Sequence, residues 1–449
     1  MKRFLSMLLV FCLVLSMVAC GNNANVENQI EVANNSSDIA IDEDVASSLN
    51  ATITVQTETG WMEYYEAAKA RVLEKYPDAT INLIETGAFD HMEVIDSTDV
   101  TNPDVADLFA IPADRLTGFA QNNVLASLDA KAIADAVGGF DNYDAGLGGN
   151  LTVDGDYLAF PMNIETLIIF ANTANAEANG IDLTEKIEFT DLGPEDMLIP
   201  AFNAWFGIAM TNSADIELLG MRDDGFYSDL TTEWADLDSD KQAVFTAMYD
   251  YWKSHDELGT DVWDLNATWG YMDGEFATGG ANALRLDGPW GTAGLSEKAG
   301  NGADLEILPI TQVTINGNPL THWKSGWGLV VNARIEDNVD QMTLATAMIE
   351  EIVNPDYAVD LFKQTGKILE HVSAETYANS DLSETDKKTV AAVLESYEAA
   401  ANRPLFKEWG SVWGTWENST LSWSAVKPNS VEEAYSELKA AFDAMMMNY

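Results

Sequence analysis

An acidic and a basic residue stand side by side where an apolar stretch of this sequence ends. Asp114 and Arg115 follow Pro112, which closes the run FAIP, and they open a predicted helix. Junctions between strand and helix lie at the edge where open α/β sheets receive ligands. From the residues alone the pair has two interpretations: a contact to a bound molecule, or a local cap in which the two side chains pair with each other.

Tryptophans at turns and helix starts are the second group of candidates. Trp290 lies in LDGPWG, where Gly288 and Gly291 indicate a turn that lines a cavity rather than a core position. Trp409, Trp413 and Trp416 are spaced four and three residues apart, which places them on one face of a helix. The alternative is that this face of the helix packs into the hydrophobic core, and at least one of the three tryptophans must do so.

Aromatic planes combined with a few charged groups suit a carbohydrate. Sugar rings pack their C–H faces on aromatic rings, while their hydroxyls need carboxylate acceptors and guanidinium donors. The chain has 13 tryptophans and 14 tyrosines to supply such surfaces. A quaternary ammonium compound in an aromatic cage is a different ligand class, but such a cage disfavours an arginine such as Arg115.

The elements that must position these residues follow an alternating order. ATITVQTETG (51–60) predicts a strand, WMEYYEAAKARVLEKYPD (61–78) a helix, and TINLIE (80–85) and ADLFAI (106–111) two further strands. This order is typical of a parallel α/β lobe. Asp154-Gly155 predicts a hairpin. With 449 residues and 47% hydrophobic content, the chain can build more than one core.

Neither a metal site nor a catalytic motif is expected. Asp236, Asp238 and Asp240 resemble the start of a calcium loop, but Lys241 takes the place of the turn glycine and no glutamate closes the loop, so helix capping is favoured. No HExxH, GxSxG or P-loop pattern is present, and the four histidines lack ligand spacing. Carboxylate pairs for glycoside hydrolysis can be imagined among 73 acidic residues, and their number decides nothing. We therefore predict no catalytic residue, no metal and no cofactor.

The N-terminus predicts export. Residues 1–19 combine a basic start with an apolar run and read as a signal peptide. MVAC before Gly21 resembles the lipobox of bacterial lipoproteins, which implies lipid on Cys20; ordinary secretion with a stray cysteine is the alternative. Residues 20–50 are rich in Asn, Ser and Asp without any aromatic residue, so we predict a flexible tether.

The charge excludes some partners. The formal net charge is −50, from 73 acidic and 23 basic residues. Nucleic acids and anionic headgroups need Lys and Arg to neutralise phosphate, so contact with a membrane is expected through the lipid anchor only.

Several separate segments resemble, in one order, the maltodextrin-binding proteins, which are the substrate-binding subunits of sugar ABC transporters. These segments are ADLFAIPADRLTGFAQNNVLASLD, GDYLAFPMNIETLIIFANT, ALRLDGPWGTAGL, DLEILPI, GWGLVVNARIED and RPLFKEWGSVWGTWENS. The resemblance covers residues 51–446 and implies an α/β fold of two lobes with three crossovers, near 163–166, 323–328 and within 373–385. The implied N-lobe is 51–164 plus 328–375, and the implied C-lobe is 165–327 plus 376–449.

The resemblance also implies site residues for an oligosaccharide, most simply maltose or a maltodextrin, in the cleft. Trp416 is assigned to packing, and Thr57, Glu58 and Trp61 are weak candidates because their loop is short. Ile111, Ala113 and Ala201 depart from the family pattern and leave the glycan's length and linkage open. The implied ligand-binding residues are Asp114, Arg115, Glu165, Phe202, Trp205, Trp290, Trp409 and Trp413.

The expected biology follows from the same resemblance. The chain would be a monomer held by its lipid anchor on the outer face of the bacterial cell membrane. It would close around its ligand and deliver it to an ABC permease, and it would not be an enzyme. Glu165 lies at the first crossover, and the alternative to its ligand contact is that its carboxylate finds its hydrogen-bond partners within the crossover itself.

Overall fold

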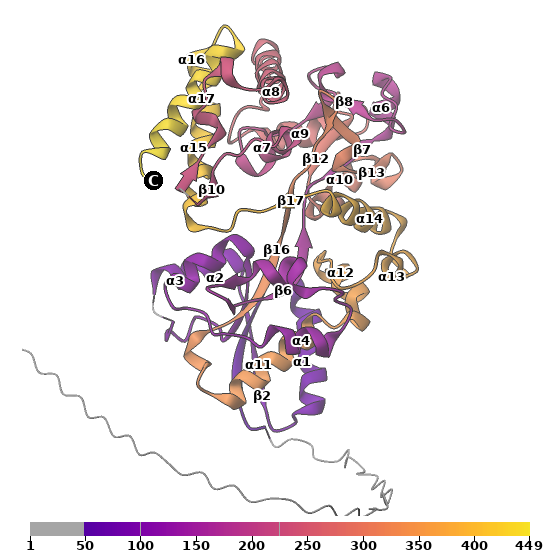
Figure 1. The fold of residues 1–449 in the computed structure, drawn as a ribbon. Coiled ribbons are helices and arrows are strands. Elements are labelled where there is room, and N and C mark those ends of the chain that lie inside the picture. The colour runs from indigo at the N-terminus through magenta and orange to yellow at the C-terminus, as the bar shows by residue number, and fades with distance from the viewer. Residues whose placement is uncertain (1–48, 99, 224) are drawn as a thin grey trace, which may run out of the picture. The chain divides into compact units, whose positions relative to one another are not determined.

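The computed structural model describes residues 49–98, 100–223 and 225–449 (Figure 1). The predicted signal peptide, Cys20 and nearly all of the tether lie outside the described residues. Among the described helices, none is both long and apolar enough to span a bilayer.

The first of two large sheets contains the predicted strand, helix, strand order. Its strands are β1 (Thr52–Thr57), β2 (Thr80–Glu85), β3 (Leu108–Pro112), β6 (Phe160–Glu165), β16 (Trp323–Val331) and β17 (Ala401–Asn402). β1 pairs in parallel with β2 and β3, whereas β16 runs antiparallel to both β3 and β6. Because β3 and β6 flank β16, their carboxyl-terminal residues lie close to its first half.

Helix α1 (Met62–Lys75) covers this sheet through the face predicted from the sequence. Trp61, Tyr64, Ala68 and Val72 are all buried. The α1 helix packs against α11 (Val339–Ile352), and the Tyr64 hydroxyl donates to the Ile352 carbonyl at 2.8 Å. The spacing of apolar residues therefore gave the correct buried face of this helix.

The second large sheet lies in the upper part of Figure 1. Some of its buried residues form a second core, while others, such as Phe170 and Ile307, join the core of the first sheet. Its strands, in spatial order, are β13 (Leu305–Pro309), β7 (Ile168–Asn172), β12 (Leu284–Asp287) and β9 (Met197–Leu198). Helices α7 (Ala204–Thr211), α8 (Ser239–Leu258), α15 (Gly410–Leu421) and α17 (Val431–Met446) contribute buried residues to its core. Helix α14 (Glu384–Glu398) packs against β13.

The chain passes between the sheets at defined places. β6 of the first sheet and β7 of the second are separated only by Thr166 and Leu167. β16 carries the chain back to the first sheet, and the stretch between α12 (Ala358–Thr365) and α14 carries it to the second again. The lobe boundaries drawn from the sequence stay a prediction.

Local signals read from the sequence have clear structural outcomes. Asp154 and Gly155 both have positive φ (54° and 95°) between β4 (Thr152–Val153) and β5 (Asp156–Tyr157), as the hairpin prediction requires. The Asp238 carboxylate accepts hydrogen bonds from the N–H groups of Asp240 and Lys241, so it caps α8. Within the described ranges no cluster of His, Cys, Asp and Glu could hold a metal ion.

Candidate functional site

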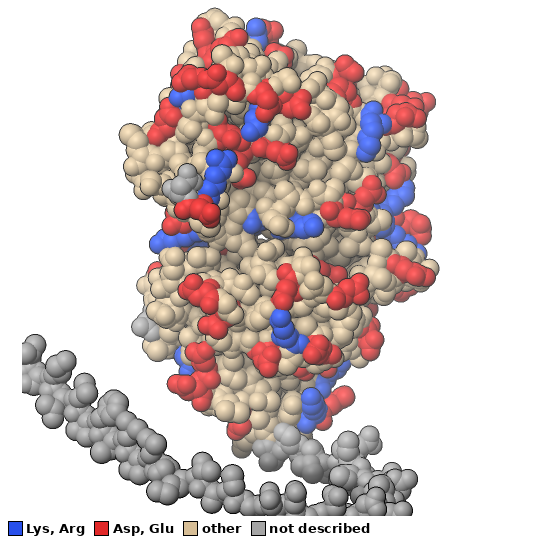
Figure 2. All heavy atoms as spheres, viewed as in Figure 1, with Lys and Arg blue, Asp and Glu red and all other residues tan. Residues whose placement is uncertain are grey.

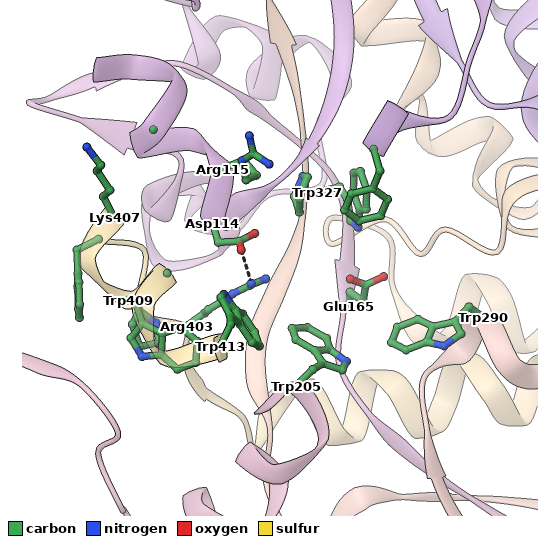
Figure 3. Close-up of a pocket in the computed structure, with 16 residues that line it drawn as sticks. Asp114, Arg115, Glu165, Trp205, Trp290, Trp327, Arg403, Lys407, Trp409 and Trp413 are labelled. Carbon is green, nitrogen blue, oxygen red and sulfur yellow. Dashed lines mark ion pairs between the residues drawn. The ribbon is translucent and has the colours of Figure 1, made fainter. Parts of the chain in front are cut away.

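A cavity of about 700 Å³ brings together residues that follow both large sheets. Figure 2 shows that acidic side chains are spread over the visible face and that this face is hollowed between its upper and lower parts. Aromatic side chains form much of the cavity lining: Phe89, Trp205, Trp290, Trp327, Phe406, Trp409 and Trp413. The charged lining residues are Asp114, Arg115, Glu165, Arg403 and Lys407 (Figure 3).

Asp114 lines this cavity from the turn that follows β3. Its Oδ2 lies 2.8 Å from Nη2 of Arg403, while its Oδ1 is buried and has no hydrogen-bond partner. No side chain caps the short helix α3 (Leu116–Gln121) that follows. The capping interpretation of Asp114 is therefore wrong, and one of its carboxylate oxygens has no hydrogen-bond partner.

Arg115 is not the partner of Asp114. Its Nη2 lies 2.6 Å from Oδ2 of Asp96 on helix α2 (Ala88–Ser97). The guanidinium carbon also lies 4.9 Å from the Phe119 ring centroid. Asp114 and Arg115 are therefore neighbours in the sequence that both line the cavity, but each pairs with a different residue.

Arg403 is a functional candidate that the sequence alone did not reveal, as are Trp327 and Lys407 in the lining of the same cavity. The Arg403 side chain is only 7% exposed, and Nη1 donates to Oγ of Ser325 at 2.8 Å. Its guanidinium carbon lies 5.2 Å from the ring centroid of Trp205 and 5.9 Å from that of Trp413. Burial lowers the pKa of Arg403, while Asp114 and Glu165 act in the opposite direction. The signal that could have found it is its place in RPLFKEW, directly before the tryptophan cluster.

Glu165 ends β6 and faces a second base. Its Oε1 lies 4.0 Å from Nζ of Lys367. This ammonium lies 4.9 Å from the ring centroid of Trp327 and 5.3 Å from that of Trp61. In Figure 3, Glu165 lies between Trp327 and the pair Trp205 and Trp290. Trp61 therefore contacts Lys367, the partner of Glu165, and does not itself line the cavity.

Trp205 and Trp290 form one wall. Their ring centroids are 6.5 Å apart with an interplanar angle of 42°, and Trp290 is 53% exposed. A Cβ at Gly288 would lie 2.1 Å from the Trp290 ring, so this ring position requires glycine. The Asp287 carboxylate, which accepts from the Gly288 N–H and pairs with Arg285, holds the turn at the end of β12.

Trp409 and Trp413 form a second wall at the start of α15. Their centroids are 4.7 Å apart, and both rings contact Trp323, the first residue of β16. Trp416, by contrast, is fully buried and donates its indole N–H to the Ala201 carbonyl at 2.9 Å. Its assignment to packing is confirmed.

Phe202 does not line the cavity. Its side chain is 1% exposed and packs against Trp263, with centroids 6.1 Å apart. Asn203 caps α7, so the chain turns there and directs Trp205 to the cavity while Phe202 remains in the core. The other seven predicted ligand-binding residues line the cavity: Asp114, Arg115, Glu165, Trp205, Trp290, Trp409 and Trp413.

The described fold is similar to that of one class of solved structures, the two-lobe solute-binding proteins. The structure aligns with maltose-bound maltose-binding periplasmic protein MalE from Listeria monocytogenes at a TM-score of 0.66, covering 89% of this chain and 99% of that one at 18% identity. MalX from Streptococcus pneumoniae, solved with maltopentaose, aligns at a TM-score of 0.65, covering 87% and 99% of the two chains at 15% identity. The predicted fold class is therefore confirmed.

Within that class, the sequence is similar to a maltodextrin-binding protein. Over 376 residues it is 25% identical to the maltodextrin-binding protein MdxE of Bacillus subtilis strain 168, covering 80% of this chain and 82% of that protein. No family model matches the sequence. The resemblance to maltodextrin-binding proteins that the sequence motifs indicated is confirmed, and the relatives named here are binding proteins.

Proposed function

We propose that this protein captures an oligosaccharide of the maltodextrin class in the cavity between its two sheets. The observation that carries this proposal is a cavity of about 700 Å³ walled by tryptophans and supplied with paired acids and bases. Its volume falls in the usual range for small-molecule sites, roughly 300 to 1,000 Å³. The maltose and maltopentaose in the relatives' structures support the same ligand class.

The lining suits a sugar better than a cation. Trp205 and Trp290 offer flat faces to sugar rings, and the free carboxylate oxygen of Asp114 can accept from a hydroxyl. A quaternary ammonium compound would meet Arg115, Arg403 and Lys407 in the same cavity. Because like charges repel across such short distances, we do not favour that ligand.

We further propose that the protein works outside the cell as a lipid-anchored delivery subunit. Cys20 would carry the lipid, and residues 20–50 would tether the folded part at the outer face of the cell membrane. An ABC permease would accept the ligand from the closed protein. Replacing Cys20 by Ser should release the protein from the membrane fraction into the medium, and unchanged fractionation would contradict the anchor.

Binding is tested most directly by calorimetry and thermal shift. Maltose, maltotriose and maltopentaose should give saturable heat and raise the melting temperature, since a ligand at 100 times its Kd adds about 2.7 kcal/mol. Glycine betaine should do neither, and a reducing-end assay should detect no cleavage of the glucans. Stabilisation by betaine alone, or release of new reducing ends, would replace this function by the ammonium or hydrolase alternative.

A further inference from the structure

We propose that Arg403 is a positioning residue that holds Asp114 for the ligand and links the two halves of the site. The proposal rests on the proposed sugar-binding function and adds a residue and a mechanism to it. Its basis is the ion pair between a turn after the first sheet and a loop that leads into the second core (Figure 3).

Both segments leave strands of the first sheet, and only the one that carries Arg403 continues into the second core. Asp114 follows β3, whose last residue, Pro112, pairs with Trp327 of β16. Arg403 follows β17, and the loop after it enters α15, where Trp409 and Trp416 belong to the second core. The Thr117 hydroxyl donates to the Leu405 carbonyl at 2.8 Å and is a second link between the same segments.

Arg403 is held on several sides. Ser325 accepts from Nη1, Asp114 pairs with Nη2, and the rings of Trp205, Trp323 and Trp413 surround the guanidinium carbon at 5.2 to 5.9 Å. An arginine has five N–H donors in a fixed fork, so these two polar contacts leave donors that can face a sugar hydroxyl.

Asp114 gains a defined orientation from this partner. With Oδ2 engaged by Arg403, Oδ1 is left buried and without a partner. An unsatisfied buried acceptor is costly, and a hydroxyl donor from the ligand would remove that cost. Without Arg403, the carboxylate would lose both its orientation and its compensating charge.

Calorimetry on the full chain with maltopentaose tests the positioning role. Arg403→Gln should weaken binding about 30-fold or more, because the carboxylate left behind in a buried site loses its partner. Arg403→Lys keeps the charge without the planar fork and should recover part of the loss. Arg71→Gln is the matched control, because Arg71 pairs with Glu351 at 2.6 Å outside the cavity, and it should bind as the unchanged protein does.

A double-mutant cycle separates positioning from a general structural effect. The double variant Asp114→Asn, Arg403→Gln should bind maltopentaose no more weakly than the single variant with the lower affinity. The reason is that both substitutions break the same ion pair. Circular dichroism confirms that each variant is folded. Wild-type affinity in Arg403→Gln, or additive losses in the double variant, would overturn the positioning role.

The link between the halves is measured without a ligand. Small-angle scattering should give a larger radius of gyration for Arg403→Gln and for Asp114→Asn than for the unchanged protein and Arg71→Gln. Superimposable profiles would overturn the link. If the unchanged protein binds maltopentaose and the Arg403 variants do too, the inference fails while the proposed function stands. If it binds no glucan, the proposed function fails together with the positioning role.

Discussion

Each charged side chain inside the cavity, apart from Lys407 at its exposed edge, has a partner from a distant segment. Asp114 pairs with Arg403, Glu165 faces Lys367, and Arg115 pairs with Asp96. A buried charge is costly unless it is paired, so the partners of Asp114 and Glu165 allow a strongly acidic chain to place these carboxylates where water is scarce. A neutral, hydroxyl-rich ligand fits such a site because it adds hydrogen bonds without adding charge.

The tryptophan walls give the first prediction at the residue scale. Trp290→Ala or Trp413→Ala should weaken maltopentaose binding by about 1 to 3 kcal/mol, because each removes one stacking face. Trp234→Ala is the matched control, since that ring packs on Tyr435 away from the cavity. Calorimetry measures the three affinities. Equal affinity in all three variants would exclude these walls as the sugar platform.

His322, behind Trp205, gives a prediction about pH. Its Nε2 donates to the Trp205 carbonyl at 2.8 Å, and burial lowers its pKa to about 3 from an ordinary value of 6.5, with the nearby Arg403 charge adding to the effect. The unfolded chain therefore takes up a proton first as the pH falls below 6.5, and stability is lost between pH 6.5 and 3. The slope from this one group approaches about 1.4 kcal/mol per pH unit.

Denaturant unfolding at several pH values checks the His322 contribution. In the His322→Asn variant, the free energy of unfolding should fall less steeply with pH below pH 6.5. The difference in slope corresponds to at most one bound proton, whatever the stability of the variant at pH 8. Parallel curves for the variant and the unchanged protein would show that His322 does not cause the loss.

Sequence reasoning found the cavity residues that carry a local pattern and missed those defined by a distant partner. Asp114, Trp290 and Trp413 stand at turns or on a helical face, which their neighbours reveal. Arg403 and Lys367 become functional candidates only through contacts with Asp114, Glu165 and Trp327, which lie far away in the sequence. No spacing rule relates such pairs.

At the scale of elements, the ends of strands and the starts of helices place the site. Asp114 follows β3, Glu165 ends β6, Trp290 follows β12, and Trp409 and Trp413 begin α15. Side chains at such ends can face the cavity while the core beside them fixes their position. This explains how half-exposed Trp290 keeps a defined position above Gly288.

The cap of α8 gives a prediction at this scale. Asp238→Ala removes the acceptor for the N–H groups of Asp240 and Lys241, which lie 3.1 and 3.0 Å away. The free energy of unfolding should fall by about 1 kcal/mol. Chemical denaturation measures it, and added calcium should change neither variant nor parent. A calcium-dependent stability lost in the variant would restore the metal interpretation of this acidic stretch.

The strands and helices of the first lobe were predictable because their periods are clear, whereas the sequence around the start of α7 left the register of its aromatic residues open. In AFNAWFG, both Phe202 and Trp205 fit an aromatic contact to a ligand. The position of the cap decides between them: because Asn203 begins the helix, Phe202 precedes it and enters the core against Trp263. The position of such a turn depends on the residues that pack around it, and the sequence of these seven residues alone does not specify them.

At the scale of the whole molecule, two sheets contribute residues to one cavity and are joined by short crossovers. Thr166 and Leu167 are the only residues between β6 and β7, and Glu165 stands next to them. A ligand that contacts residues of both sheets makes more contacts, and binds more tightly, when the sheets approach each other. Binding and closure are then coupled through differential contacts, as in any two-state equilibrium.

Ligand-driven closure is the prediction that follows. Addition of saturating maltopentaose should reduce the radius of gyration in small-angle scattering, because Asp114 on one side and Trp205 and Trp290 on the other line the same cavity. The Trp290→Ala, Trp413→Ala double variant should show the change only at higher ligand concentration, since it loses affinity and keeps the hinge. Superimposable profiles at a concentration where calorimetry shows full saturation would mean that the sugar binds without closing the lobes. A permease would then have to recognise the ligand-bound protein by some feature other than the distance between its two sheets.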